Sequence, residues 1–87
     1  MKLSTLKFKI YTKDSCDFCI RAKHTLSTMD LTYDEIRLEE HPEEKARLKA
    51  EGFKTVPQIY FGERHIGGYT ELVKYLTDEK VYTRQSA

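Results

Sequence analysis

Two cysteines separated by two residues constrain this chain more than any other feature. Cys16 and Cys19 are its only cysteines, and they follow an alternating segment, residues 6–12, that is typical of a half-buried β-strand. Apolar side chains then recur at helical spacing, at Cys19, Ala22, Leu26 and Met29. The pair therefore lies where a strand leads into a helix, in a short loop that can expose one thiol and keep the second within bonding distance.

The remaining patterns predict the element order β-α-β-α-β-β-α. Further strands are expected at residues 32–38, 57–61 and 64–66, and further helices at 41–51 and 70–77. The first half can form a right-handed parallel βαβ unit, and the terminal hairpin can extend its sheet. We therefore predict an α/β fold with a four-stranded mixed sheet packed by three helices.

Polar residues before the helices indicate how they begin. Asp14 and Ser15 offer N-cap oxygens to the first helix, and Thr70 offers one to the third. The apolar side of the third helix is expected to include Val73. In the second helix, residues 43–45 read as a solvated face.

Size and charge exclude several classes of protein. The 87 residues suit one domain, 1–87, with a core over about 6–77 and a polar tail at 81–87. A net charge of +1 points to neither nucleic acid nor an anionic membrane, and no apolar run is long enough to span a bilayer. Without a secretory signal, we expect a cytoplasmic monomer, and in a reducing compartment such a cysteine pair is typically catalytic.

Position favours Cys16 as the nucleophile. A helix N-terminus, Lys13 and an S–H hydrogen bond from Cys19 should each lower its pKa below the ~8.5 of an ordinary thiol. Cys19, further along the buried stripe, would resolve the mixed disulfide. Asp17 acts against this, because a carboxylate ~6 Å away at a dielectric of ~40–80 disfavours the thiolate by about 0.7–1.4 kcal/mol.

Two other interpretations of the cysteines remain open. They can be small core side chains, or they can hold a metal or iron–sulfur cluster shared between two chains. A zinc site within one chain is disfavoured, since His24, His41 and His65 lack the spacing of metal ligands. We therefore expect no metal cofactor.

Four motifs occur in order along the chain: Ile10-Tyr11-Thr12-Lys13, Cys16-x-x-Cys19, Thr55-Val56-Pro57 and His65-Ile66-Gly67-Gly68. Together they resemble the dithiol glutaredoxins. The resemblance implies a thioredoxin-like fold, redox chemistry at both cysteines and glutathione as the reductant. It also implies disulfide-containing or glutathionylated proteins, ribonucleotide reductase among them, as substrates.

The resemblance further implies where glutathione binds. Pro57 would be cis, and the backbone of Val56 would pair with the cysteinyl unit of glutathione like an added strand. The N–H groups of Tyr69 and Thr70 would hold the γ-glutamyl carboxylate, beside a close backbone approach at Gly68. On residues alone, Pro57 can equally start an ordinary strand, and the two glycines can form a simple turn.

The same resemblance implies contacts at the other end of glutathione. Lys13 would meet the glycyl carboxylate, Thr55 would shape that side, and Phe18 would provide an aromatic wall. The chain departs from the family pattern by having Asp17-Phe18 between the cysteines, where proline and tyrosine are usual. Glu44 also stands where relatives often place a glutamine or arginine, and it would repel the glycyl carboxylate.

One further departure stands at Glu71, and two rival functions remain open, the first of them because of Asp17 and Glu44. Glu71 replaces the aspartate that usually meets the ammonium group of glutathione, so this contact is not transferred. The first rival is an electron donor reduced by thioredoxin reductase instead of glutathione. The second is an iron–sulfur carrier with glutathione as co-ligand.

Overall fold

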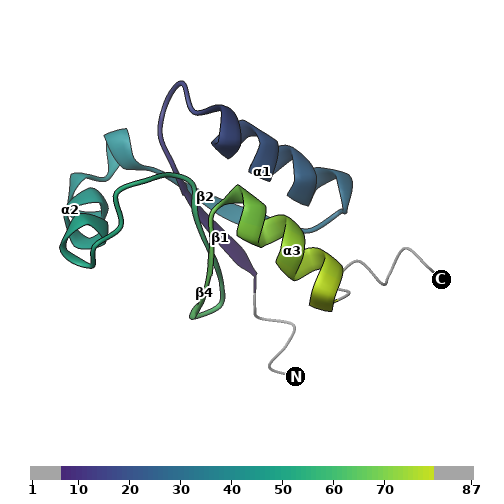
Figure 1. Ribbon diagram of the computed structural model, residues 1–87. Helices are drawn as coiled ribbons and strands as arrows, with labels where there is room; N and C mark the ends of the chain where they lie inside the picture. Colours follow the sequence, from purple (N-terminus) through teal and green to yellow (C-terminus); the bar gives the residue numbers. More distant parts are fainter. Residues whose placement is uncertain (1–6, 80–87) are drawn as a thin grey trace.

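The structure, a computed structural model, describes residues 7–79, and the elements follow the predicted order (Figure 1). They are β1 (Phe8–Thr12), α1 (Asp17–Thr28), β2 (Tyr33–Arg37), a 3-10 turn η2 (Leu38–Glu40), α2 (Pro42–Ala50), β3 (Gln58–Phe61), β4 (Arg64–Gly67) and α3 (Tyr69–Glu79). The predicted tail at 81–87 lies outside the described residues. Over residues 7–79, no helix is long and apolar enough to cross a bilayer.

The four strands form one mixed sheet in the order β2-β1-β3-β4. β1 is parallel to β2 and antiparallel to β3, and β3 and β4 form the expected antiparallel hairpin. The register places Ile10 between Glu35 of β2 and Ile59 of β3. The mixed sheet and the three helices confirm the predicted architecture.

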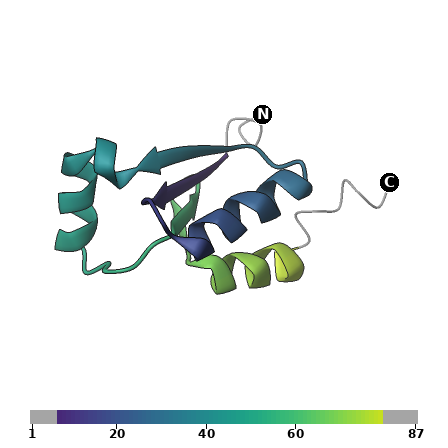
Figure 2. The same cartoon turned by 90° about the horizontal axis from the view of Figure 1, so that it is seen from above.

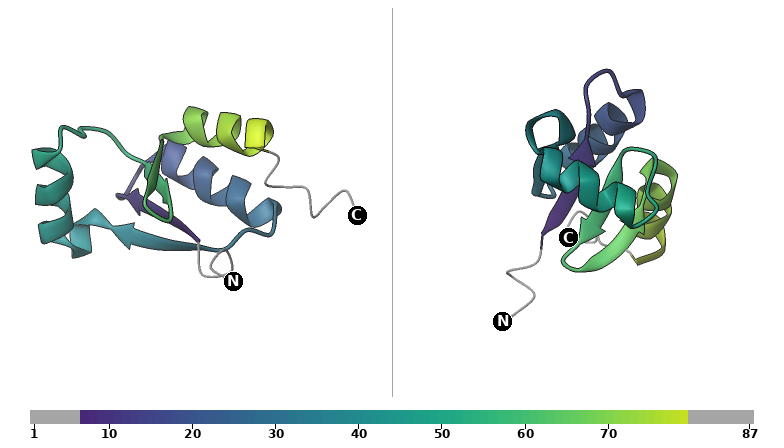
Figure 3. Two further views of the ribbon diagram at one scale, coloured as in Figure 1. Left: turned by 90° about the horizontal axis from the view of Figure 1, so that it is seen from below. Right: turned by 90° about the vertical axis from the view of Figure 1, so that its left-hand side faces the viewer.

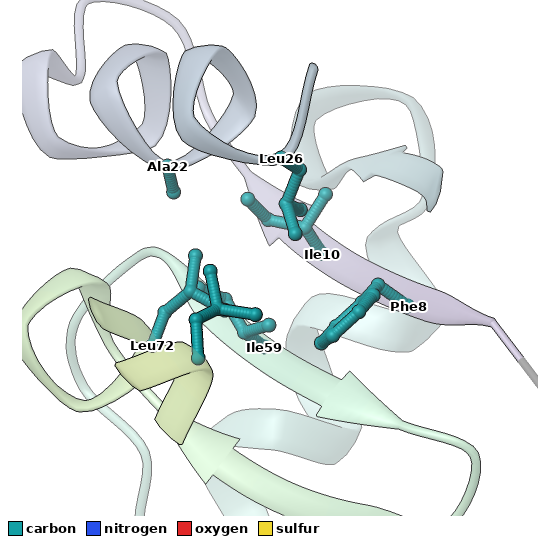
Figure 4. Close-up of a cluster of buried hydrophobic side chains, with 7 residues drawn as sticks. Phe8, Ile10, Ala22, Leu26, Ile59 and Leu72 are labelled. Atoms are coloured by element: carbon teal, nitrogen blue, oxygen red, sulfur yellow. The ribbon is translucent and has the colours of Figure 1, made fainter. Parts of the chain in front are cut away.

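α1 and α3 lie side by side on one face of the sheet, whereas α2 lies at the opposite end of the molecule, beyond the end of β2 (Figures 2 and 3). The main core fills the space between these two helices and the sheet (Figure 4). Its buried members come from β1, α1, β3 and α3: Phe8, Ile10, Ala22, Leu26, Ile59, Leu72 and Leu76. Cys19, Ala22 and Leu26 are all buried, so the helical stripe predicted for α1 is confirmed.

The other face of β1 is more buried than strict alternation predicts. Tyr11 is only 2% exposed and packs with Leu38 of η2 and Leu48 of α2 in a second apolar cluster. Its hydroxyl accepts a hydrogen bond from Arg47 Nη2 at 2.7 Å. The prediction of a half-buried strand is therefore wrong at Tyr11, because α2 and η2 cover that part of the sheet.

The helix starts also differ from the prediction. Cys16, not Asp14 or Ser15, is the N-cap of α1, because Asp14 pairs with Arg37 and Ser15 adopts a left-handed φ of 58°. α3 already begins at Tyr69, which places Thr70 inside the helix instead of at its cap. Val73 faces outward and is 39% exposed, so its assignment to the apolar side of α3 was wrong.

Glu35 joins three elements next to the core. Its Oε2 accepts hydrogen bonds from Thr12 Oγ1 of β1 at 2.7 Å and from Lys23 Nζ of α1 at 2.9 Å. Burial alone would raise the pKa of Glu35, but the hydrogen bonds from Lys23 and Thr12 outweigh it and lower the pKa. A carboxylate with a lowered folded-state pKa stabilises the fold above its unfolded-state pKa, and this stabilisation disappears as the pH falls through the folded-state value.

Replacing this carboxylate should therefore weaken the fold in a pH-dependent way. Glu35→Gln is expected to lower the free energy of unfolding at pH 7 by about 1 kcal/mol, because Lys23 loses its charged partner. The loss should shrink in acid, where the wild-type carboxylate is itself protonated. Urea titrations at pH 7 and pH 3 measure both effects, and the exposed Asp34→Asn is the matched control. An equal loss at both pH values would contradict this role of Glu35.

Candidate functional site

The two cysteines are joined by a disulfide at the start of α1, with their Cα atoms 5.2 Å apart. Cys16 is half-buried, whereas Cys19 is only 2% exposed. The inequivalence expected from the sequence is therefore present in the fold: an incoming molecule can reach the sulfur of Cys16 more readily than that of Cys19.

Cys16 caps α1 with its own sulfur. Its backbone is extended, and its Sγ accepts the backbone N–H of Cys19 at 3.1 Å. This N–H is one of the donors that a helix start leaves without an intrahelical partner. A thiolate is a better acceptor than a thiol and also gains from the positive end of the helix dipole, so the position favours an ionised Cys16 in the reduced protein.

The loop before β3 lies against this sulfur. The Val56–Pro57 peptide bond is cis, as the resemblance implies, and the carbonyl oxygen of Val56 lies 3.7 Å from Cys16 Sγ. Within residues 7–79, the backbone N–H of Val56 has no hydrogen-bond partner. The loop thus presents a backbone donor and acceptor beside the disulfide.

Gln58 holds that loop in place. Its Nε2 donates to the carbonyl oxygen of Thr55 at 2.9 Å, and its Oε1 lies 2.7 Å from His65 Nε2. The His65 ring is packed between Phe53 and Tyr60. Sequence reasoning missed Gln58. The sequence did contain a signal, because a glutamine directly after Pro57 begins a strand whose inner face should be apolar. A polar side chain at such a position is expected to have a hydrogen-bonding role.

Seven of the residues expected to bind glutathione line one hollow, which we call the disulfide cleft: Phe18, Thr55, Val56, Pro57, Gly68, Tyr69 and Thr70. Glu71, which was not expected to bind, also lines it. The ring of Phe18 stacks on that of Tyr69, with centroids 5.9 Å apart, and remains 54% exposed. The lining of the cleft therefore combines this aromatic pair with residues 55–57 of the loop before β3.

The beginning of α3 forms the far end of the cleft. By helix geometry, the backbone N–H groups of Tyr69 and Thr70 have no intrahelical partner, which makes this end a place for an anion. Glu71 Oε1 accepts the N–H of Gly68 at 2.9 Å. Gly67 has a φ of 127°, and a Cβ there would come within 2.8 Å of the Glu71 side chain. Gly67 thus permits the turn that brings Glu71 back over the start of its helix.

Lys13 lies in a neighbouring hollow instead of the disulfide cleft. We call this hollow the lysine pocket, and it shares Thr55 and Val56 with the cleft. Its other residues are basic or apolar: Lys13, Lys45, Lys49, Lys54, Leu38, Leu48 and Phe53. The structure thus places the ten expected site residues around two adjoining hollows and the disulfide between them.

Glu44 does not line the lysine pocket. It pairs instead with Arg47 at 2.9 Å, and the expected repulsion of a glycyl carboxylate by Glu44 stays a prediction. Lys45 faces the pocket together with Lys49, one turn further on. Glu43 and Lys45 are exposed and Glu44 is partly buried, so the solvated face predicted for residues 43–45 is largely confirmed. The four-residue spacing of Lys45 and Lys49 was the signal that both could line one hollow.

Among residues 7–79, no group of three or more His, Cys, Asp or Glu side chains is placed to hold a metal ion. What the site offers is a helix-capping sulfur, a second buried sulfur, an unpaired backbone edge and two places for anions. These features suit exchange of a disulfide in an extended, negatively charged peptide.

Comparison with known proteins gives consistent matches. The family model "Glutaredoxin" matches residues 8–66. A glutaredoxin from Pseudomonas aeruginosa is 44% identical over 64 residues, which cover 72% of this chain and 76% of that protein. The crystal structure of glutaredoxin 1 from Francisella tularensis matches with a TM-score of 0.72 at 30% identity, over 88% of this chain and 98% of the other. A buckwheat glutaredoxin–glutathione complex matches with a TM-score of 0.73 at 25% identity, over 91% and 76%. The expected thioredoxin-like fold is thereby confirmed.

The charge next to Cys16 gives a test of its activation. Asp17 occupies the first position of α1, so Asp17→Asn should raise the thiolate fraction of reduced Cys16 and its alkylation rate by iodoacetamide at pH 6 by about 3- to 10-fold. Asp30→Asn, at the far end of α1, serves as the control and should leave the rate unchanged. Equal rates for wild type and Asp17→Asn would contradict the electrostatic account.

Proposed function

The chain belongs to the glutaredoxin family, and on that premise we propose that it is a glutathione-dependent thiol–disulfide oxidoreductase. Its substrates would be protein disulfides and the mixed disulfides that glutathione forms with proteins. The observation that carries the proposal is the position of the Cys16 sulfur, which caps α1 and lies beside the backbone of Val56.

In the proposed cycle, the Cys16 thiolate attacks one sulfur of the substrate disulfide and displaces the other as a thiolate, which takes up a proton. Cys19, as a thiolate, then attacks the sulfur of Cys16. The second substrate thiol leaves, and the Cys16–Cys19 disulfide closes. The protein returns to the dithiol by exchange with two glutathione thiols, so that each cycle moves two electrons and two protons from glutathione to the substrate.

The residues of the two hollows fit glutathione as an extended peptide. The backbone N–H and carbonyl of Val56 would pair with its cysteinyl unit, and the N–H groups of Tyr69 and Thr70 would hold its γ-glutamyl carboxylate. Lys13 would meet the glycyl carboxylate at the edge of the lysine pocket. The complex of a related buckwheat glutaredoxin with glutathione supports this choice of reductant.

We place the protein in the cytoplasm, since disulfide reduction by glutathione needs a reducing compartment. We also propose that it acts as a monomer. Ribonucleotide reductase is one candidate substrate, as the resemblance to the dithiol glutaredoxins implies. The single-thiol reaction on glutathionylated proteins needs only Cys16, whereas reduction of a protein disulfide also needs Cys19.

Two variants separate these reactions. Cys16→Ser is expected to abolish both. Cys19→Ser should reduce protein disulfides at least about 10-fold more slowly, because the mixed disulfide has no resolving thiol, while deglutathionylation continues. Insulin reduction and release of glutathione from a glutathionylated peptide measure the two activities, and circular dichroism checks the fold of each variant. A similar loss in both assays for Cys19→Ser would argue against this division of labour.

The source of electrons needs its own test. With NADPH present, we expect turnover with glutathione and glutathione reductase, and little or none with thioredoxin reductase. Turnover with thioredoxin reductase alone would refute glutathione dependence and support the rival electron donor.

The turn before α3 gives a test of glutathione binding. Gly67→Ala should raise the KM for glutathione, because the added Cβ would displace Glu71 and the start of α3.

A further inference from the structure

We propose that the lysine pocket binds acidic and apolar residues that follow the attacked cysteine in a protein substrate. The inference rests on the proposed function, because it names the class of protein disulfide that this site would prefer. It assigns a role to Lys45, Leu48 and Lys49 of α2 and to Phe53 and Lys54 after it, which the proposed function does not use.

The pocket concentrates positive charge in a nearly neutral protein. Four lysines line it although the whole chain has a net charge of only +1. In the described part of the chain, no carboxylate forms an ion pair with any of the four, whereas Lys7, Lys23 and Lys74 are all paired. Lys13 does have a carboxylate nearby. The pKa of Glu39 is lowered mainly by a hydrogen bond from the backbone N–H of Asp14, and the charge of Lys13 adds to this lowering. Lys45, Lys49 and Lys54 are therefore the ammonium groups of the pocket that are most open to an external anion.

α2 separates its charges onto two sides. Lys45 and Lys49, one turn apart, face the pocket. Glu44 and Glu51 instead pair with Arg47, at 2.9 and 3.0 Å. Because the acidic side chains are held on another side of the helix by Arg47, they do not neutralise the lysines of the pocket.

The pocket also has an apolar floor, which points to a peptide instead of a small inorganic anion. Leu38 and Leu48 are buried there, and Phe53 and Val56 are partly buried beside them. An ion such as phosphate gains nothing from such a floor, whereas an apolar side chain gains stability in proportion to the apolar surface that it buries there. A segment that combines an apolar residue with carboxylates fits both features.

Glutathione itself leaves most of this pocket unused. Its single glycyl carboxylate is assigned to Lys13, so Lys45, Lys49 and the apolar floor have no partner in it. Thr55 and Val56 line both hollows, so the lysine pocket begins where the disulfide cleft ends. A polypeptide placed on Val56 in the direction of glutathione would carry the residues after its cysteine into the lysine pocket.

Short peptides can test this preference directly. The probes are symmetrical disulfide dimers of acetyl-glycyl-cysteinyl-leucyl-glutamyl-glutamyl-amide, with two controls that have glutamine for glutamate or serine for leucine. We expect kcat/KM, measured with glutathione and glutathione reductase, to be about 5- to 10-fold higher for the parent than for the glutamine peptide at low salt, mainly through KM. The advantage should fall below about 2-fold in 0.5 M salt, which screens exposed charges. The serine peptide should also be a poorer substrate than the parent.

The variant Lys45→Gln/Lys49→Gln assigns the effect to the pocket. It should remove most of the preference for glutamate over glutamine, whereas Lys7→Gln/Lys74→Gln, with the same change in net charge, should retain it. Equal kcat/KM for all three peptides with the wild type would refute the inference but leave the proposed function intact. A glutamate preference that persists in Lys45→Gln/Lys49→Gln would also refute it. Failure to reduce any peptide with glutathione would instead count against the proposed function.

Discussion

The hydrogen bond from the Cys19 N–H to the Cys16 sulfur is the contact on which the site depends. It places the sulfur at the N-terminus of α1, where the helix start leaves backbone N–H groups without intrahelical partners. The same helix buries Cys19, Ala22 and Leu26 in the core, so the geometry at the sulfur is fixed by packing along the whole element. The reactive sulfur is thus held at the end of a helix whose inner side is buried in the core.

The second half of the site comes from residues distant in sequence. The sheet brings β3 beside β1, so the segment before β3 reaches the cysteine loop. Gln58 then fixes the carbonyl of Thr55, and His65 of β4 fixes Gln58. A short chain of side-chain hydrogen bonds therefore connects the terminal hairpin to the backbone beside the disulfide. The position of Val56 depends on this hairpin as well as on its own loop.

Local patterns predicted much of this arrangement. The element order, the mixed sheet and the buried stripe of α1 follow from apolar spacing and turn residues, which are properties of neighbouring residues. Tyr11 was misplaced because its burial depends on α2 and η2, which contact it only through the tertiary fold. The cap of α1 was misassigned because Asp14 finds a partner in Arg37, 23 residues away. The lysine pocket was missed for the same reason, since its lining comes from four separate segments.

The separation of α2 from the other helices has a consequence for how proteins of this design can diverge (Figure 2). Reactivity resides in α1 and the loop before β3, whereas the charged lining added by α2 belongs to a nine-residue helix outside the main core. Exchanges at its exposed positions can therefore alter the charge that lines the lysine pocket while leaving the packing around the disulfide unchanged. In this fold the lining of that pocket and the position of the disulfide can change independently of each other.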